Sequence, residues 1–380
     1  MNSPKIRKRS TSDGTKIHLI EQMSQVDKWH AGFKAPADIT AIVESMGFQA
    51  KRLFSRRPRN PIAHVATNLL RLLDAVRIAV TTPGHAIVFV QYPIFSALRP
   101  GRICLWLLHK LRHATVISLI HDIDALRGRG IVDESGMAPE LHSLLNASDK
   151  IIVHNENMCA WLAKRGIPFD RMIPLGLFDY LIPEFTPFQD TEFDKTVIIA
   201  GNLSSQKSPY LSHLKEIEGV RWRLFGPNYD AEWLAGDNVS YGGSFPPEQI
   251  PFKLGTGFGL VWDGTDIDTC SGASGEYLRI NNPHKLSLFL AAGLPVFIWN
   301  EAAEAAFVNK QAVGIPIANL KEIGLCLAAM TAAEYEQLVA NVHKVGASLR
   351  SGEFTRAAIL SAMRIVDDKK GFNILYESST

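Results

Sequence analysis

The stretch SGASGEYLRINNPHKLSLFLAAGLPVFIW (271–299) decides the fold, because it joins a glycine-rich start, a helical segment and a buried strand. Pro283 suits the first turn of a helix, and Gly293 with Pro295 ends that helix before the apolar run begins. Lys285 falls in the first turn, where the helix dipole favours an anion. The stretch therefore predicts an anion site with a cationic clamp. The alternative is a capped amphipathic helix that carries a lysine by chance.

The same alternation of short apolar runs and segments of helical periodicity extends through most of the chain. Buried strands that are followed by helices are typical of parallel sheets covered on both faces. The sequence therefore predicts an α/β fold. The expected strands cover residues 86–91, 115–120, 150–154, 172–174, 196–200, 222–225, 258–262 and 295–299. The expected helices cover residues 100–112, 155–165, 283–292 and 332–345.

Small or polar residues follow several of these strands. Ligands of open α/β sheets bind at the carboxyl ends of the strands, so the pattern favours a cleft between two sheets. The alternative is that these residues simply begin ordinary loops. The strand ends are VQYP (90–93), LIHDID (119–124), IVHNEN (152–157), IAGNLSS (199–205), LFGPN (224–228) and VWDG (261–264).

The chain length of 380 residues is enough for two domains, at roughly 100–200 residues per domain. The segment YLIPEFTPFQDTEFDK (180–195) has two prolines, four acidic residues and no clear periodicity, and it is the natural boundary. We expect one Rossmann-like domain at 1–185 and a second at 186–350. We expect residues 351–380 to form a helix that packs back on the first domain.

The composition excludes several classes of protein. Hydrophobic residues make up 46% of the chain, so it is neither disordered nor collagen-like. The net charge of +2 is too balanced for a protein that neutralises many phosphates of a nucleic acid. The four cysteines are scattered, which fits a reducing compartment and no zinc site or disulfide framework. They are Cys104, Cys159, Cys270 and Cys326.

No signal peptide is visible, and the longest apolar stretch, 288–299, is shorter than the ~20 residues that cross a bilayer. We therefore expect a soluble, cytoplasmic protein, or at most a peripheral one at the inner face of the membrane. Two segments leave weak membrane attraction open as an alternative. One is the basic tail of Lys5, Arg7, Lys8 and Arg9; the other is RICLWLLHKLRHA (102–114), which more often would cover a sheet.

The segment PHKLSLFLAAGLPV (283–296) resembles the P-x-K-L-x-E-x-L-A-A-G-x-P-V signature of GT-B glycosyltransferases. The likeness narrows to the bacterial β-1,6-galactofuranosyltransferase-like family, which includes a glucosyltransferase of adhesin glycans. It spans roughly residues 29–341 and implies two Rossmann-like domains that face a central cleft. The domain at 1–185 would then bind the acceptor, and the domain at 186–350 would bind the nucleotide sugar. The supporting segments are AGFKAPADI (31–39), LIHDIDALRG (119–128), SDKIIVHNENM (148–158), LGLFDYL (175–181), AGNLSSQKSPYL (200–211) and CSGASGEYLRINNPHKLSLFLAAGLPV (270–296).

The resemblance and the strand ends together give candidates for binding the donor. Glycosyl transfer develops negative charge on the leaving diphosphate, which cations and helix N-termini stabilise. Lys285 and Lys207 are the expected cations, and Glu276 would bind sugar hydroxyls. The other candidates are Asn202, Ser204, Gly275, Asn281, Asn282 and His284. Many GT-B enzymes hold the nucleotide ribose with a carboxylate at the position that is Leu288 here, so that contact must come from elsewhere.

An inverting transferase also needs a base beside the acceptor hydroxyl. Asp122 and Asp124 follow an expected strand of the first half, where they would face the cleft, and His121 is the rival base. A pair of this kind at a strand end is nearly as often a structural cap.

Other motifs favour no competing chemistry. Asp122–x–Asp124 and Asp266–x–Asp268 imitate a metal-binding DxD, but GT-A enzymes place one such motif after a single nucleotide-binding half, whereas this chain looks doubled. His109 and His113 share a helix face without a third ligand. No serine has a G-x-S-x-G setting.

The resemblance implies a metal-independent, inverting transfer of a hexose from a UDP-sugar to a cell-surface glycan, on lipid or protein. UDP-galactofuranose is the first choice of donor and UDP-glucose the second, with no cofactor. A homo-oligomer is also implied. Two alternatives stay open: an NAD-dependent epimerase, for which the expected G-x-G-x-x-G is missing, and a non-catalytic partner of a transferase, which the change at Leu288 leaves possible.

Overall fold

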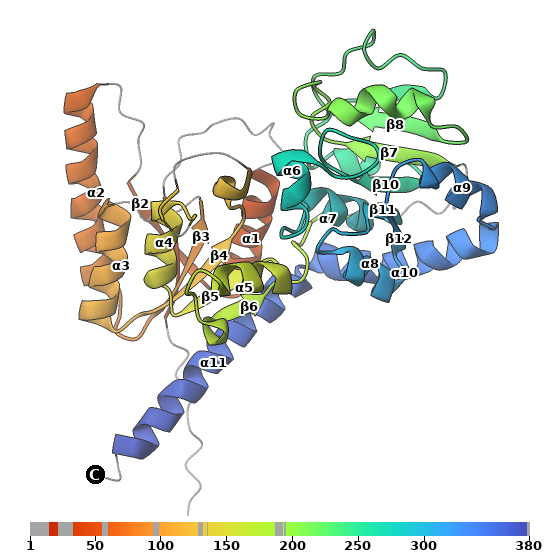
Figure 1. Cartoon of the computed structure of the whole chain (residues 1–380). Coiled ribbons are helices and arrows are strands. Elements are labelled where there is room, and N and C mark those ends of the chain that lie inside the picture. The colour runs from red at the N-terminus through yellow and green to blue at the C-terminus, as the bar shows by residue number, and fades with distance from the viewer. Residues whose placement is uncertain are drawn as a thin grey trace, which may run out of the picture.

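The described part of the chain forms two parallel six-stranded sheets with helices around each, as the computed structural model shows (Figure 1). It describes residues 15–21, 33–54, 60–93, 99–127, 132–134, 136–186, 193 and 195–377. The first sheet has the order β2-β1-β3-β4-β5-β6 and the second β12-β11-β10-β7-β8-β9. All eight strands expected from the sequence are present, so the predicted parallel α/β fold is confirmed.

The strands of the first sheet are β1 (Lys16–Glu21), β2 (Gln49–Leu53), β3 (Ile87–Tyr92), β4 (Thr115–Ile120), β5 (Lys150–Val153) and β6 (Met172–Pro174). Those of the second are β7 (Thr196–Ala200), β8 (Arg221–Phe225), β9 (Val239–Gly243), β10 (Phe258–Val261), β11 (Val296–Trp299) and β12 (Gly314–Ile317). The four strands that the sequence analysis did not find are β1, β2, β9 and β12.

Helices cover both faces of the first sheet, as its unbroken apolar strands require. Val88 and Val90 of β3 pack in one cluster with side chains of α2, α3, α4 and α5. Phe89, which lies between them, packs on the opposite face with α1. The helices are α1 (Lys34–Ser45), α2 (Pro61–Thr81), α3 (Arg99–Arg112), α4 (Pro139–Asn146) and α5 (Glu156–Ala163).

The second sheet is packed in a single cluster that includes three fully buried tryptophans, Trp222, Trp262 and Trp299. The glycine-rich start of the deciding stretch forms the short helix α6, and Pro283 is the N-cap of α7. Lys285 is the second residue of α7 and so lies in the first turn, as expected. The helices are α6 (Gly272–Tyr277), α7 (His284–Ala291), α8 (Ala305–Gln311), α9 (Glu322–Ala329) and α10 (Ala332–Ser351). Short 3-10 turns lie at η2 (Asp124–Arg127), η3 (Phe169–Arg171), η4 (Pro209–Glu216) and η5 (Ile250–Phe252).

The last helix, α11 (Glu353–Glu377), returns from the second half of the chain to the first sheet (Figure 1). Ala358, Ile359 and Ala362 pack in the same cluster as Phe89. Gly352 makes the turn between α10 and α11 with φ +80°, and a Cβ there would approach Ile42 of α1 to 2.7 Å. The domain limits at 185 and 350 stay a prediction.

A buried carboxylate, that of Asp179, accepts hydrogen bonds from the first turn of α11. Asp179, in the segment after β6, accepts hydrogen bonds from the backbone N–H of Thr355 at 2.7 Å and of Phe354 at 3.3 Å. These N–H groups belong to the first turn of the helix, where backbone N–H groups have no acceptor within the helix itself. Burial raises the pKa of Asp179 to about 6, although the hydrogen bonds from Thr355 and Phe354 oppose that rise.

Among the described residues, no helix combines the length and the apolar content needed to cross a bilayer. The basic residues Lys5, Arg7, Lys8 and Arg9 lie outside the described part of the chain.

Candidate active site

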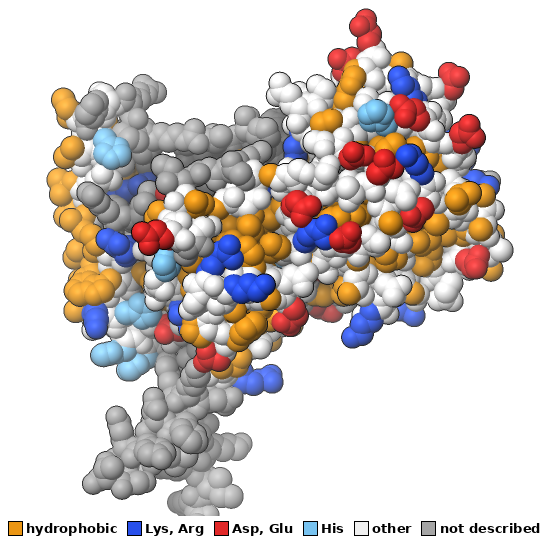
Figure 2. All heavy atoms as spheres, in the orientation of Figure 1, with side chains coloured by type: hydrophobic (Ala, Val, Ile, Leu, Met, Phe, Trp, Pro, Cys, Tyr) orange, Lys and Arg blue, Asp and Glu red, His pale blue; other side chains and the backbone are white. Residues whose placement is uncertain are grey.

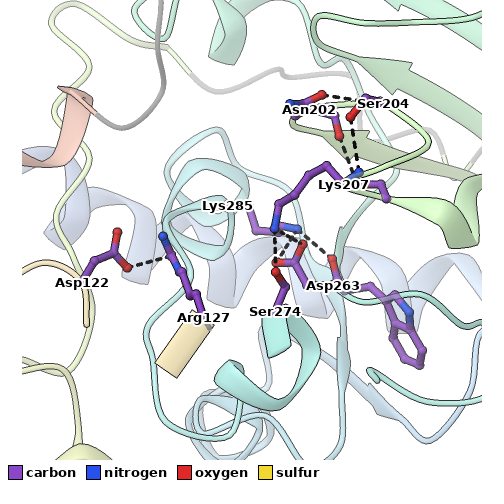
Figure 3. A network of polar contacts seen from close by, with 10 residues as sticks. Asp122, Arg127, Asn202, Ser204, Lys207, Asp263, Ser274 and Lys285 are labelled. Carbon is purple, nitrogen blue, oxygen red and sulfur yellow. Dashed lines mark hydrogen bonds and ion pairs between the residues drawn. The ribbon is translucent and has the colours of Figure 1, made fainter. Parts of the chain in front are cut away.

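A cavity of about 340 Å³ lies where the carboxyl ends of the two sheets meet. The first half of the chain contributes His121 and Asp122, which follow β4, and the N-terminal end of α1. The second half contributes the loop after β7, Asp263 after β10, and the start of α7. The cleft expected from the polar strand ends is therefore present. Figure 3 shows a network of polar contacts at this site.

Two lysines converge on one carboxylate at the edge of the second sheet (Figure 3). Lys285 Nζ lies 3.1 Å from Asp263 Oδ2 and donates to the carbonyl oxygen of Trp262 at 2.7 Å. Lys207 Nζ lies 4.0 Å from Asp263 Oδ1 and donates to Ser274 Oγ at 3.0 Å. The two cations predicted from widely separated motifs therefore occupy one site, beside the N-terminus of α7.

The loop after β7 holds Lys207 in place through its own polar side chains. Ser204 Oγ accepts from the backbone N–H of Lys207 at 3.3 Å. Asn202 Oδ1 accepts from the N–H of Ser204 at 3.0 Å and from Asn228 at 2.9 Å. Asn202 lines the cavity, whereas Ser204 shapes the loop behind it.

Asp122 faces the lysine site from the first sheet (Figure 3). Arg127 Nη2 lies 2.7 Å from its Oδ1, and Tyr277 of α6 donates to the same oxygen at 3.4 Å. Burial raises the pKa of Asp122, and the Arg127 guanidinium opposes that rise. Asp124 is exposed on η2 and does not line the cavity. The two candidate carboxylates thus lie in different environments.

Three histidines surround the ring of Phe178 at the base of the cavity. The ring centroids of His121, His154 and His284 lie 5.5, 5.0 and 6.4 Å from that of Phe178. His121 donates from Nε2 to Gln91 Oε1 at 2.7 Å, which leaves its Nδ1 as an acceptor. Burial lowers the pKa of His121 and His154 to about 3 and that of His284 to about 4, so all three are neutral at pH 7.

The two asparagines before α7 have different surroundings. Asn282 joins the two halves of the chain: it donates to the carbonyl oxygens of His154 (2.8 Å) and Gly176, and accepts from Asn155 at 2.6 Å. Asn281 also lines the cavity, and its buried Oδ1 has no hydrogen-bond partner among the described residues. Asn281 is therefore the one of the pair whose side chain has an unused acceptor beside the cavity.

Two further candidates do not line the cavity. Glu276 is exposed and pairs with Arg279 at 2.8 Å, so its assigned contact with sugar hydroxyls stays a prediction. A Cβ on Gly275 would approach the carbonyl oxygen of Cys270 to 2.5 Å, which gives this glycine a packing role.

Leu288, at the position of the carboxylate in many GT-B enzymes, is buried in the core of the second half. The other acidic pair, Asp266 and Asp268, lies outside the cavity lining, and Asp268 pairs with Lys321 at 2.8 Å. His109 lies outside the cavity lining, and its Nε2 contacts the carbonyl oxygen of Ala147.

Comparison with solved structures identifies the fold. The lipopolysaccharide outer core galactosyltransferase WaaB superposes with a TM-score of 0.55 at 11% identity, over 91% of this chain and 99% of that one. Anabaena Alr3699/HepE, solved with UDP and glucose, superposes with a TM-score of 0.54 at 10% identity, over 91% and 99%. The chain has the GT-B glycosyltransferase fold.

The chain belongs to the glucosyltransferase 3-like family. Residues 17–177 match its N-terminal domain and residues 197–362 its C-terminal domain. The chain is 35% identical to the β-1,6-galactofuranosyltransferase WbbI of Escherichia coli K12 over 304 residues, 79% of this chain and 86% of the relative. It is 25% identical to glucosyltransferase 3 of Streptococcus gordonii over 331 residues, 87% and 93%. The protein is a glycosyltransferase, and these relatives do not favour the epimerase or the non-catalytic partner.

Sequence analysis missed Asp263, Arg127 and Tyr277 as members of the site. Asp263 does follow a strand, in VWDG, so its position at a strand end was the available signal. Arg127 and Tyr277 come from opposite halves of the chain, and the Arg127 guanidinium lies 4.9 Å from the centre of the Tyr277 ring. A contact between such distant segments has no signature in one sequence.

Proposed function

We propose that the chain transfers a hexose from a UDP-sugar to a cell-surface glycan, with the diphosphate bound at Lys207 and Lys285. The observation that carries the proposal is the convergence of both ammonium groups on Asp263, beside the first turn of α7 and across the cavity from Asp122. A helix N-terminus with adjacent cations is suited to a pyrophosphate.

The second half of the chain would stabilise the leaving group. As the bond between the sugar C1 and the phosphate oxygen breaks, negative charge grows on UDP. Lys207 and Lys285 are already held near that charge by Asp263, Ser274 and the carbonyl oxygen of Trp262, so little reorganisation is needed. We propose that this arrangement serves without a metal ion or other cofactor.

The first half would bind and deprotonate the acceptor. Asp122 is the proposed base: its carboxylate takes the proton of the acceptor hydroxyl while that oxygen forms the new bond to C1 from the face opposite UDP. This direct displacement inverts the anomeric centre. Burial favours the role, because a raised pKa makes Asp122 a better proton acceptor than an exposed aspartate. His121, which lies beside it, would accept a hydrogen bond from the acceptor sugar.

The relatives suggest the donor sugar and its setting. WbbI is named a galactofuranosyltransferase and the streptococcal relative a glucosyltransferase, so galactofuranose is the first choice and glucose the second. The proposed acceptor is a growing glycan on lipid or protein in the bacterial cytoplasm, at the inner face of the membrane. Assembly into a homo-oligomer stays a prediction.

The test is thermal unfolding with UDP, UDP-galactofuranose, UDP-glucose, GDP-mannose or NAD, followed by a transfer assay with and without EDTA. A ligand at one hundred times its dissociation constant adds about 2.7 kcal/mol to the free energy of unfolding. A UDP-selective shift that Lys285→Ala weakens supports the proposal. Lys321→Ala is the matched control, because Lys321 is an exposed, ion-paired lysine outside the cavity lining. A shift with NAD alone, or none, contradicts the proposal.

A further inference from the structure

Helix α2 presents an apolar face to solvent along its whole length. Its exposed side chains range from Leu72 at 37% to Ile62 at 82% of their full accessible surface. In Figure 2 they form a continuous hydrophobic border on the side of the molecule farthest from the second sheet. The exposed apolar residues of α2 are Ile62, Val65, Leu69, Leu70, Leu72, Leu73, Val76 and Val80. Exposed apolar patches of this extent usually mark an interaction site.

The neighbouring helix α3 extends this surface with a different composition. Trp106 and Leu111 are each 56% exposed, and the exposed cations Arg102 and Lys110 lie on the same helix. An open hollow of about 700 Å³ beside Trp106 is lined by Arg102, Lys110 and His109 of α3, and also by Asp133, which pairs with His142 at 2.9 Å. An indole between cations is suited to the boundary between lipid headgroups and acyl chains.

The charge of the two helices identifies the partner. Together α2 and α3 contain six lysines or arginines and one acid, Asp74, in a chain whose net charge is only +2. Asp74 is already paired with Arg77 at 2.9 Å. The surface therefore joins apolar side chains with positive charge, which complements an anionic bilayer.

We propose that the exposed face of α2 and α3 binds an anionic phospholipid membrane. The apolar side chains of α2 and Trp106 enter the headgroup region, while Arg102 and Lys110 contact lipid phosphates. The surface lies on the half of the chain that contributes Asp122, so binding would hold the acceptor half of the cavity beside a lipid-carried glycan. Only this last step rests on the proposed function.

A second copy of the chain fits the same face less well. A two-fold arrangement that buries both α2 and α3 against the same helices of a second copy would bring Arg102 and Lys110 of one copy towards the same cations of the other. The only acid on these two helices is Asp74, which is already paired. Like charges at an interface oppose association, whereas a bilayer rich in anionic lipid supplies the missing negative charge.

The experiment is sedimentation of the full-length protein with vesicles of phosphatidylcholine, alone or mixed one-to-one with phosphatidylglycerol. We expect binding to the mixed vesicles, release by high salt, and little binding to phosphatidylcholine alone. The double variant Leu69→Gln/Leu73→Gln should weaken binding about ten-fold or more, and so should Arg102→Gln/Lys110→Gln. Leu325→Gln is the matched control, because Leu325 is 75% exposed on α9 of the other half.

Three outcomes overturn the proposal. The first is absence of binding to the mixed vesicles at low salt, and the second is binding that both double variants retain. The third is a dimer, measured by light scattering, that Leu69→Gln/Leu73→Gln dissociates, because the face would then belong to a second copy. The UDP-induced thermal shift is measured on the same preparations, so loss of membrane binding is separable from failure of the donor site.

Discussion

The carboxylate of Asp263 lies 3.1 Å from the ammonium group of Lys285, at the point where β10 ends and α7 begins. The same carboxylate is 4.0 Å from Lys207, so one negative charge orients two positive ones. This arrangement places cations where the helix dipole already favours an anion.

Asp263→Asn tests whether this orientation matters for the chemical step. We expect kcat to fall about ten-fold, equivalent to about 1.4 kcal/mol, because Lys207 and Lys285 lose the charge that positions them. The dissociation constant of UDP should change less, since removing an anion near the diphosphate offsets the lost positioning. Steady-state kinetics and calorimetric titration with UDP measure the two effects. Weaker UDP binding with an unchanged kcat would instead assign Asp263 to ground-state binding.

Asp122→Asn tests the proposed base. We expect kcat to fall at least about 100-fold, the usual contribution of a positioned base, while UDP binds as tightly as before. Asp124→Asn is the control, because Asp124 is exposed two residues away and does not line the cavity. A transfer assay with the two variants distinguishes them. Full activity in Asp122→Asn would transfer the role to His121.

Glu304→Gln tests a buried carboxyl group between the two halves. Burial raises the pKa of Glu304 to about 8, against a usual value of 4.5, and Asn155 donates to it at 3.2 Å. The folded state therefore holds this proton at a pH where the unfolded chain has lost it, and stability falls as the pH rises towards 8. The limiting slope is about 1.4 kcal/mol per pH unit.

Denaturant unfolding between pH 7.5 and 8.5 measures this slope, because histidines with the usual pKa of 6.5 are then largely neutral in the unfolded chain as well as in the folded state. The wild type should lose stability with rising pH, and Glu304→Gln should lose clearly less. Glu301→Gln is the control, since Glu301 is an exposed neighbour that pairs with Arg279. Parallel curves for wild type and Glu304→Gln would show that the carboxyl group is not held protonated.

Leu288→Glu restores the acid found at this position in many GT-B enzymes. Because Leu288 is 7% exposed within the core, we expect the charge to lower the free energy of unfolding by about 3 kcal/mol without tightening UDP binding. Leu288→Met should cost less than about 1.5 kcal/mol. Thermal unfolding with and without UDP measures both the stability of each variant and its UDP-induced shift. A larger UDP-induced shift in Leu288→Glu than in the wild type would contradict the expectation.

The sequence predicted the fold well because buried parallel strands are continuous apolar runs. Strands such as β4 and β7 stand out for that reason, whereas β9 (VSYGG) is half-exposed and lacks the signal. Helix α2 was not predicted as an element, although its exposed face is its most unusual property.

Residues of the candidate site were predictable only where a local sequence signal marked them. Lys285 was predicted because it lies at an expected helix start, and Lys207 and Asp122 because they follow expected strands. Asn282 illustrates the limit: its amide is bound across the junction to His154 and Asn155, which lie more than a hundred residues away. Whether a polar side chain meets a ligand or its own protein depends on such distant contacts.

The return of α11 to the first sheet has a consequence for the order in which the protein is made. The face of β4, β5 and β6 that packs against Ala358, Ile359 and Ala362 is translated long before the helix that covers it. A nascent chain must therefore carry this apolar surface open until synthesis is almost complete. A stop codon near residue 351 would remove only the last helix from the sequence, yet it would leave the domain synthesised first without part of its core.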